Sequence, residues 1–600
     1  MSASTADDIT ATLLAHAAGR PGAPVLSAPT RAPMTWGTLA QRIRDARGRL
    51  ASWGIERGDV LAAAAVDRVE CAAAVAILPV SSTFAALDPT LAVGDYVDLL
   101  RRTGAKAVLV PARGDHPIGE AARRLGIAEI AMIPDRAAEA GAFDLALVRA
   151  TASLDTAPRR NAGWAYVGAT SGTTGRPKLV PYGHRQALAT SRAMGERLAM
   201  TPGDVSGHLT PLHLANGQRP ALLLAMLNGG SVHCLPEADA GAFLDAVDRD
   251  AITYVSASFT IQRELIERLR IGRHVRAGRL RFLRVASGRL EPDEFARLED
   301  AFGVPAITGL GTTEGGILVH QRLPPAPRTH GSVGDPLASE IRIVGDDGRE
   351  VVEGEVGELQ ARGPQVFDGY LDDPALTAAT FVDGWYRSGD LGRVDASGDV
   401  YLVGRATDVI NRGGEKFAPL QIEAALRAIP GVADAAAFGV PHPRLGQEIV
   451  AAVVREPGVP LTGAELQSRA RAALGPRRSP RRVWFVDAIP RNAAGKVLRQ
   501  SLAAHVGHLS AAACALPQVD DARSSPLEAA IAGLWAAVLG RPAVGRDDDF
   551  RTIGGDAFQA ARLVGEVRTL FAVEIDADAV EGEASTPARM ARLVERAMRH

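Results

Sequence analysis

The residues best suited to chemistry lie in one run, YVGATSGTTGRPK, between Tyr166 and Lys178. The stretch from Thr170 to Thr174 offers four hydroxyl groups and a series of backbone N–H groups. Gly172 and Gly175 let the chain approach an anion closely, and Lys178 adds a mobile positive charge. The run is therefore suited to wrapping a polyphosphate, although clusters of this composition also form ordinary surface turns.

Two common nucleotide-binding patterns do not fit the chain. A P-loop reads G-x-x-x-x-G-K-[ST], whereas Arg176 and Pro177 separate Gly175 from the following lysine. The segment GLGTTEGG begins like a dinucleotide-binding G-x-G-x-x-G, but Glu314 occupies the last glycine position. Thr313 and Glu314 instead supply a hydroxyl and a hard carboxylate, the ligand types that magnesium uses beside nucleotide phosphates.

A third motif, WYRSGDLG, places Asp390 directly after a glycine. A carboxylate there could accept hydrogen bonds from both hydroxyls of a ribose. Taken alone the motif is weak, because most aspartates in such turns only cap or bend the chain.

These groups must be positioned by folded elements, and the hydrophobic pattern predicts an α/β fold. Short apolar runs at 60–66, 107–110 and 254–256 alternate with longer stretches of helical period. From Ile341 onward, short strands with acidic turns predict a smaller β-rich unit, and a second α/β piece follows Arg405.

Length and composition limit the class of protein. Six hundred residues predict two to four domains, and 46% hydrophobic with 23% charged residues is typical of a soluble globular protein. The net charge of −2 argues against nucleic acid and anionic membrane as partners. The first residues lack the pattern of a signal peptide.

Charge and cysteine usage predict a cytoplasmic protein. The longest apolar region, 60–80, contains Asp67 and Arg68, which argues against a membrane span. Cys71, Cys234 and Cys514 have no metal or redox spacing, as expected in a reducing compartment.

Taken in order, these motifs closely resemble the adenylate-forming superfamily of acyl- and aryl-CoA synthetases and nonribosomal peptide synthetase adenylation domains. The resemblance covers roughly residues 30–500. It rests on TSGTTGRPK, LGTTE, GELQARGPQVFDGYL, YRSGDLG, GRATDVINRGGEKFAPLQIE and PRNAAGKVLR. It implies a large α/β domain followed by a small mobile α+β lid.

The resemblance implies two half-reactions. A carboxylate attacks the α-phosphate of ATP to give an acyl-adenylate, and a thiol then attacks that anhydride. Lys496 would be catalytic and bridge the carboxylate and the α-phosphate, and Glu314 would hold Mg²⁺. The further ATP-binding residues implied are Thr170, Ser171, Gly172, Thr173, Thr174, Gly175, Lys178, Gly288, Leu310, Gly311, Thr313, Asp390 and Arg405.

Family members rotate the lid between the half-reactions, which brings a G-G-E loop toward the pantetheine thiol. Here that loop would be Gly413, Gly414 and Glu415, and the hinge would be Thr407 or Asp408. Two positions depart from the common pattern. Leu310 replaces the usual aromatic residue near adenine, and the frequent glycine pair reads Ser287-Gly288, so we expect altered nucleotide affinity.

The C-terminal segment resembles an acyl or peptidyl carrier domain, a small helical bundle. In GGDAFQAARLV, Ala557 stands where the family carries phosphopantetheine on a serine. Alanine has no hydroxyl, so this chain cannot receive the arm at that position. We favour a replacement of the serine, because the residues that flank Ala557 are intact, over a naturally degenerate carrier.

The identity of the acid is the least constrained part of the prediction. Amino-acid-activating relatives use an aspartate for the α-ammonium, and the best-aligned position here is Asn216. We therefore expect an aryl or short acyl acid more than an α-amino acid. The expected pocket residues are small or apolar apart from this asparagine: Asn216, Gly217, Pro220, Gly309, Ile317 and Leu318.

The expected domains are a large adenylation part (1–403), a lid (404–505), a linker (506–524) and a carrier domain (525–600). Three functions remain open. The chain could load a carrier domain in cis or in trans, as in a synthetase with downstream modules. It could be a free CoA ligase. It could also be a non-catalytic nucleotide-binding scaffold, as Ala557 and Leu310 suggest, although Lys496 and Glu314 argue against this.

Overall fold

We analysed a computed structural model of the chain. It describes residues 8–598 except for 67, 113–114, 151–160, 171–175, 250, 271–277, 289, 330, 443, 492–495, 500–501, 503–525, 540, 542–543, 554–556, 572, 581 and 583. The chain divides into two compact units, Met1–Val497 and Leu498–His600. Among the described residues, no helix is long and apolar enough to cross a membrane. The predicted linker at 506–524 lies outside the described residues.

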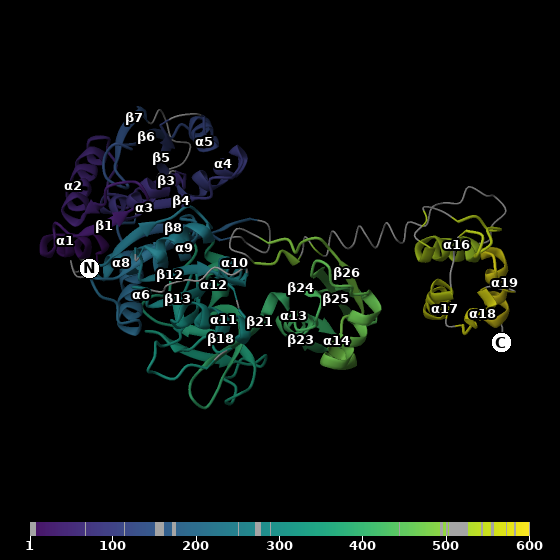
Figure 1. Ribbon diagram of the computed structural model, residues 1–600. Helices are drawn as coiled ribbons and strands as arrows, with labels where there is room; N and C mark the ends of the chain where they lie inside the picture. Colours follow the sequence, from purple (N-terminus) through teal and green to yellow (C-terminus); the bar gives the residue numbers. More distant parts are fainter. Residues whose placement is uncertain are drawn as a thin grey trace. The chain divides into compact units, whose positions relative to one another are not determined.

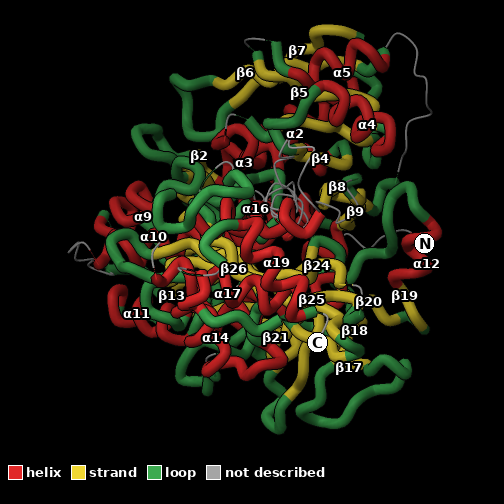
Figure 2. Tube along the Cα trace, turned by 90° about the vertical axis from the view of Figure 1, so that its right-hand side faces the viewer, coloured by secondary structure: helices red, strands yellow, loops and turns green. Residues whose placement is uncertain are grey.

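The first sheet of unit 1 is mainly parallel and carries the ends of the predicted phosphate loop. Its strand order is β7-β6-β5-β3-β4-β8-β9, with antiparallel pairs only at β6–β7 and β8–β9. Helices pack on both faces, and α4 and α5 lie together beside β5 and β6 (Figures 1 and 2). The strands are β3 (Val60–Ala64), β4 (Thr83–Leu87), β5 (Ala105–Pro111), β6 (Ala128–Pro134), β7 (Phe143–Arg149), β8 (Trp164–Thr170) and β9 (Lys178–Gly183), and the helices are α2 (Trp36–Ser52), α3 (Arg68–Ile77), η2 (Leu78–Val80), α4 (Val93–Thr103) and α5 (Pro117–Leu125).

A second sheet has the strand order β16-β15-β14-β13-β12-β10-β11-β1-β2. Neighbouring strands from β14 to β1 in this order are parallel, whereas β1 and β2 are antiparallel. Its strands are β1 (Pro24–Ser27), β2 (Met34–Thr35), β10 (Val205–His208), β11 (Ser231–Cys234), β12 (Tyr254–Ser258), β13 (Phe282–Ala286), β14 (Ala306–Thr312), β15 (Gly316–His320) and β16 (Asp335–Pro336). The accompanying helices are α1 (Ile9–Gly19), α6 (His184–Arg197), α7 (Ala215–Gln218), the π turn η3 (Arg219–Leu223), α8 (Leu224–Leu227), α9 (Ala240–Asp248), α10 (Phe259–Arg270) and α11 (Pro292–Phe302).

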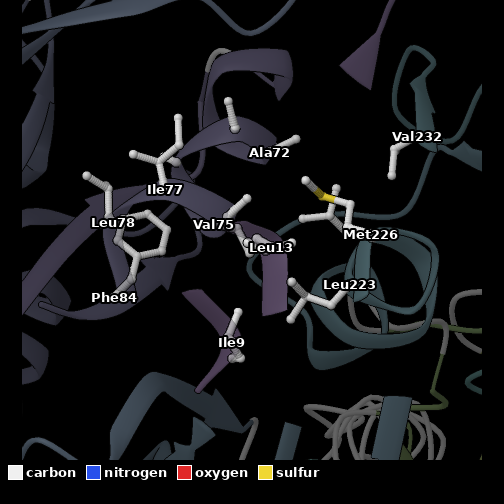
Figure 3. Close-up of a cluster of buried hydrophobic side chains, with 14 of the residues drawn as sticks. Ile9, Leu13, Ala72, Val75, Ile77, Leu78, Phe84, Leu223, Met226 and Val232 are labelled. Carbon is white, nitrogen blue, oxygen red and sulfur yellow. The ribbon is translucent and has the colours of Figure 1, made fainter. Parts of the chain in front are cut away.

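One continuous core joins the two sheets. Leu13 of α1 lies among Val75, Leu223 and Met226 (Figure 3). Val75 precedes the other two by more than 140 residues in the chain. All four side chains are at most 1% exposed, so each contributes roughly 1.5–3 kcal/mol of burial free energy. The strands that end at the candidate site are thereby held by apolar packing between the sheets.

The region after residue 340 forms the expected β-rich sheet, of order β17-β18-β20-β19 with β21 paired to β20. Strands β20 and β21 pair so that Asp390 faces Arg405 across the ladder. The two predicted ribose-binding residues are therefore neighbours because of strand register. The elements are β17 (Glu340–Val344), β18 (Gly357–Arg362), α12 (Pro374–Thr380), β19 (Phe381–Val382), β20 (Trp385–Val394) and β21 (Val400–Arg405).

The last part of unit 1 is a small α+β layer whose sheet has the order β23-β22-β25-β24, with β26 paired to β25. Gly413 and Gly414 form the two-residue turn between β22 and β23, with φ of +62° and +85°. A hairpin turn with two positive φ values favours glycine, so this pair has a conformational reason as well as a predicted role. The elements are η4 (Ala406–Asp408), β22 (Ile410–Arg412), β23 (Glu415–Phe417), α13 (Pro419–Arg427), β24 (Val432–His442), β25 (Gly446–Arg455), α14 (Gly463–Arg478) and β26 (Arg482–Phe485).

Unit 2 contains a small helical core. Trp535 is fully buried, packs edge-on against Phe550 with ring centroids 5.1 Å apart, and donates its indole N–H to Met590 Sδ at 3.3 Å. Ala557 is the first residue of α17. The helices are α16 (Pro526–Leu539), α17 (Ala557–Phe571), α18 (Ala577–Val580) and α19 (Pro587–Ala597), as expected for a carrier bundle.

Candidate active site

Among the described residues, only one of the two carboxylate oxygens of Asp390 accepts a hydrogen bond. Arg405 Nε donates to Asp390 Oδ1 at 3.0 Å, while the buried Oδ2 has no hydrogen-bond partner among the described residues. Burial raises the pKa of Asp390, although Arg405 and then Lys496 act in the opposite direction. A buried acceptor without a donor fits a ligand that brings hydroxyl groups, and the ribose of ATP is such a ligand.

Lys496 lies close to this pair, although it is about ninety residues further along the chain. Desolvation of its ammonium lowers the pKa of Lys496, and Arg405 lowers it further. Asp390, Glu314 and Asp408 act in the opposite direction. The structure thus brings Lys496, Asp390 and Glu314 into electrostatic contact, which their separate motifs could not establish.

The turn that carries Glu314 is held from several sides. Tyr370 donates its hydroxyl to Glu314 Oε1 at 2.9 Å, and the backbone N–H of Phe367 donates to the Glu314 carbonyl at 2.8 Å. Arg219 Nη2 donates to the Thr313 carbonyl at 2.9 Å. These contacts fix the carboxylate while Glu314 Oε2 makes no hydrogen bond within the described part of the chain.

The Glu314 turn fits a magnesium ion that is shared with a nucleotide. Within the described residues, no cluster of three or more His, Cys, Asp or Glu could hold a metal ion by itself. Magnesium commonly takes one or two protein carboxylates and completes its shell with water and substrate phosphates. Glu314 meets that requirement, because its Oε2 accepts no hydrogen bond within the described residues and could bind the ion.

The predicted phosphate loop starts and ends beside this turn. Thr170 at the end of β8 pairs with Lys178 at the start of β9. A Cβ on Gly168 would lie 3.2 Å from the Thr313 side chain, and Lys178 Nζ is 5.3 Å from the centre of the Tyr370 ring. The two strand ends that flank the loop therefore lie near the turn that carries Glu314. The loop residues Ser171, Gly172, Thr173, Thr174 and Gly175 lie outside the described residues.

The predicted acid-pocket residues come from four elements of unit 1. Asn216 and Gly217 lie in α7, Pro220 in the π turn, Gly309 in β14, and Ile317 and Leu318 in β15. A Cβ on Gly309 would lie 2.6 Å from the His320 ring, so this glycine lets the imidazole approach the strand. Pro220, Ile317 and Leu318 are buried, and Leu318 packs with Leu310 in the core beside β15.

The remaining predicted residues have distinct placements. Gly311 is exposed on β14, and Gly288 follows β13 where a Cβ would collide with the Phe259 ring at 2.1 Å. Thr407 and Asp408 lie in η4, between the β-rich sheet and the last layer of unit 1, and Thr407 donates its hydroxyl to Asp408 at 3.3 Å. Their roles remain predictions.

Several residues that support the site were not among the predicted ones. Arg219 is buried, with its guanidinium 3.6 Å from the centre of the Tyr182 ring, and Tyr386 bonds Thr312 through their hydroxyls at 3.1 Å. Arg284 interrupts the apolar run FLRVA and is 2% exposed. The charged residue inside this apolar strand is the signal from which the sequence could have identified Arg284.

Comparison with known proteins agrees with this geometry. Residues 13–371 match the AMP-binding enzyme family, residues 421–496 the AMP-binding enzyme C-terminal domain, and residues 529–594 the phosphopantetheine attachment site family. An oxalate–CoA ligase of Arabidopsis thaliana is 31% identical over 483 residues, which span 79% of this chain and 93% of the relative. A sulfoacetate–CoA ligase of Cupriavidus necator is 36% identical over 339 residues, or 56% and 66% of the two chains.

Solved structures show the same fold. ATP-bound MatB from Rhodopseudomonas palustris is 25% identical, with a TM-score of 0.75 over 84% of this chain and 99% of that protein. The o-succinylbenzoate coenzyme A synthetase MenE from Bacillus subtilis, in complex with ATP and magnesium, is 24% identical, with a TM-score of 0.70 over 82% and 98% of the two chains.

The fold and the site define an adenylate-forming ligase with a mainly parallel α/β body and a C-terminal carrier region. The chain belongs to the AMP-binding enzyme family, the adenylate-forming superfamily, and it is fused to a carrier domain. Its named relatives are CoA ligases, and enzymes of this class use ATP and magnesium.

Replacing Asp390 with asparagine is expected to raise the KM for ATP by about 10- to 100-fold, because charge-assisted hydrogen bonds are worth about 1.5–3 kcal/mol. Burial holds the pKa of Asp390 above its ordinary value, so protonation on acidification raises the wild-type KM for ATP earlier than an ordinary aspartate would. Asp390→Asn removes that pH dependence. The measurement is ATP–pyrophosphate exchange at several ATP concentrations and pH values.

The matched control for this prediction is Asp383→Asn. Asp383 is exposed, between β19 and β20, and its φ of +51° is one that asparagine tolerates. An unchanged KM for ATP in Asp390→Asn, at the level of Asp383→Asn, would remove Asp390 from the nucleotide site.

Proposed function

We propose that this protein activates a small carboxylic acid as an acyl-adenylate and transfers the acyl group to the phosphopantetheine thiol of a carrier domain. A nonribosomal peptide synthetase loading module works in this way. The observation that carries the proposal is the grouping of Lys496, Asp390 and Glu314 in one chain with a carrier domain. We place the reaction in the cytoplasm, where ATP is supplied.

The first half-reaction brings two anions together. A carboxylate oxygen of the acid forms a bond to the α-phosphorus of ATP, and the bond to the bridging oxygen breaks so that pyrophosphate leaves. Lys496 would neutralise charge between the two anions, while Asp390 and Arg405 would hold the ribose. Glu314 would hold magnesium, which neutralises charge on the phosphates when it is bound.

The second half-reaction needs a thiol. Its sulfur attacks the acyl carbon and loses its proton, and AMP leaves with the bonding electron pair. Gly413 and Gly414 would line the path of the pantetheine arm after a lid rotation about Thr407 or Asp408. Self-loading is blocked at Ala557, so in this chain the acceptor must be a carrier in trans, CoA, or a carrier whose serine is restored.

A free CoA ligase is the second candidate. It is favoured by the relatives, which are named CoA ligases and align over most of their length with this chain. The carrier domain favours the first candidate. Downstream synthetase modules as partners and the domain boundaries 1–403, 404–505, 506–524 and 525–600 belong to the same proposal.

Competition between the two thiols separates these candidates. We would modify an Ala557→Ser variant with phosphopantetheine, supply ATP and an acid that it activates, and add CoA. Our proposal expects a protein-bound thioester that forms faster than acyl-CoA. Rapid acyl-CoA formation with no thioester on the modified carrier would establish the CoA ligase instead.

A further inference from the structure

Arg284 is a buried cation in the middle of the second sheet. It lies on β13 and is 2% exposed. Its Nε donates to His320 Nε2 at 3.1 Å, and its Nη1 donates to Asn216 Oδ1 at 3.1 Å and to Ser256 Oγ at 2.9 Å. Nη2 has no hydrogen bond within the described residues.

The partners of Arg284 are all neutral. His320 donates its Nδ1–H to the Gln321 carbonyl at 2.7 Å, so its Nε2 is the acceptor for Arg284. Burial, and next the charge of Arg284, lowers the pKa of His320 to about 3. Burial lowers the pKa of Arg284 itself only to about 10, so the guanidinium stays protonated at neutral pH. Within the described part of the chain, no carboxylate neutralises it.

Asn216 contributes a second hydrogen-bond donor to this cluster. Arginine has only donors, so Asn216 must turn Oδ1 toward Arg284, and this fixes the orientation of the amide. Its Nδ2 is then buried, with no hydrogen-bond partner in the part of the chain that the structure describes. A buried, uncompensated cation and a buried unpaired donor on neighbouring groups are both costly to the protein by itself. An anionic acceptor would satisfy both.

These groups lie where the acid is expected to bind. Asn216 belongs to the predicted acid pocket, and the His320 ring lies against Gly309, a second member of that pocket. Thr313 and Glu314 follow Gly309 on the same strand and turn, so the cluster is continuous with the nucleotide site.

We propose that Arg284 and Asn216 bind a second anionic group, a carboxylate or sulfonate, at the end of the acid remote from the carboxylate that is activated. This inference rests on the proposed function and narrows its substrate to small acids with two anionic groups. Two relatives are named for acids with two anionic groups, the oxalate–CoA and sulfoacetate–CoA ligases.

The test compares each diacid with its monoamide, which keeps the shape and removes one charge. Acid-dependent ATP–pyrophosphate exchange is measured for oxalate against oxamate and for succinate against succinamate. For the better pair, we expect kcat/KM for the diacid to exceed that for the monoamide by about 100-fold, as for a buried charge pair. Arg284→Met should bring this ratio close to one.

A second variant guards against misfolding of the first. Asn216→Asp supplies Arg284 with a carboxylate from within the protein and repels an anionic ligand, so it should abolish the diacid preference while the fold is retained. Arg297→Met is the matched control, because Arg297 is a half-exposed arginine of α11 that pairs with Asp293. It should keep the wild-type ratio.

Calorimetric binding of each diacid and monoamide, without ATP, separates this inference from the proposed function. Diacid binding that is lost in Arg284→Met and Asn216→Asp supports the inference even if exchange is silent and adenylation fails. Exchange with monoacids, together with equal kcat/KM values for each diacid and its monoamide, would overturn this inference but not the proposed function. A diacid preference that persists in both variants would also overturn it, as would the absence of diacid binding together with silent exchange.

Discussion

Replacing Lys496 with alanine is expected to lower acid-dependent ATP–pyrophosphate exchange by about 10²–10³-fold, the typical cost of removing one group that stabilises charge in the transition state. Arg405 alone cannot substitute, because its Nε is engaged with Asp390. The second half-reaction does not need a charge between two anions. Transfer from a supplied acyl-adenylate to a thiol should therefore change by less than about 10-fold.

The contrast between the two half-reactions makes this prediction specific. Arg482→Ala is the control, since Arg482 is an exposed residue on β26 in the same layer of unit 1. It should leave both half-reactions unchanged. Equal losses in exchange and in transfer for Lys496→Ala would indicate a damaged lid, and normal exchange would show that another group carries the charge.

Introducing a hydroxyl at position 557 is expected to change the modification state of the carrier from none to complete. With CoA and a phosphopantetheinyl transferase, Ala557→Ser should gain the mass of one phosphopantetheine arm, because the phosphate needs a nucleophilic oxygen that alanine lacks. Ala557 begins α17, in a bundle whose core around Trp535 is closed. The substitution adds a single oxygen atom to the side chain.

Ala561→Ser is the matched control for this experiment. Ala561 is exposed one turn further along α17, so its hydroxyl is accessible but displaced from the expected attachment position. It should remain unmodified. Modification of Ala561→Ser as well, or of neither variant, would contradict the assignment of Ala557 as the attachment position.

Much of the fold could be predicted from local patterns. The apolar runs at 60–66, 107–110 and 254–256 are β3, β5 and β12, and the acidic-turn segments after residue 340 form the β-rich sheet. These predictions are confirmed because periodicity and turn residues act within a few positions of the chain. The pairing order of two long sheets depends on contacts across hundreds of residues, and no local pattern could give it.

For the candidate site too, single residues could be predicted from local motifs, whereas their arrangement in space could not. Asp390, Glu314 and Lys496 could be selected from motifs, but their electrostatic contact depends on strand register and on the placement of the last layer. Arg219 could not be selected in this way, because a single arginine has no distinctive spacing. If Arg284 binds the acid as we propose, the predicted pocket of small and apolar residues also includes a buried cation.

The most direct measurement is ATP–pyrophosphate exchange by the chain as it stands, because exchange requires no carrier serine. The panel would hold small diacids, matched monoacids, aryl acids and amino acids. Our account predicts exchange that depends on one class of acid and is strongest with acids that carry two anionic groups. Silence with every acid, with ATP still bound, would contradict adenylation and would establish a nucleotide-binding scaffold in its place.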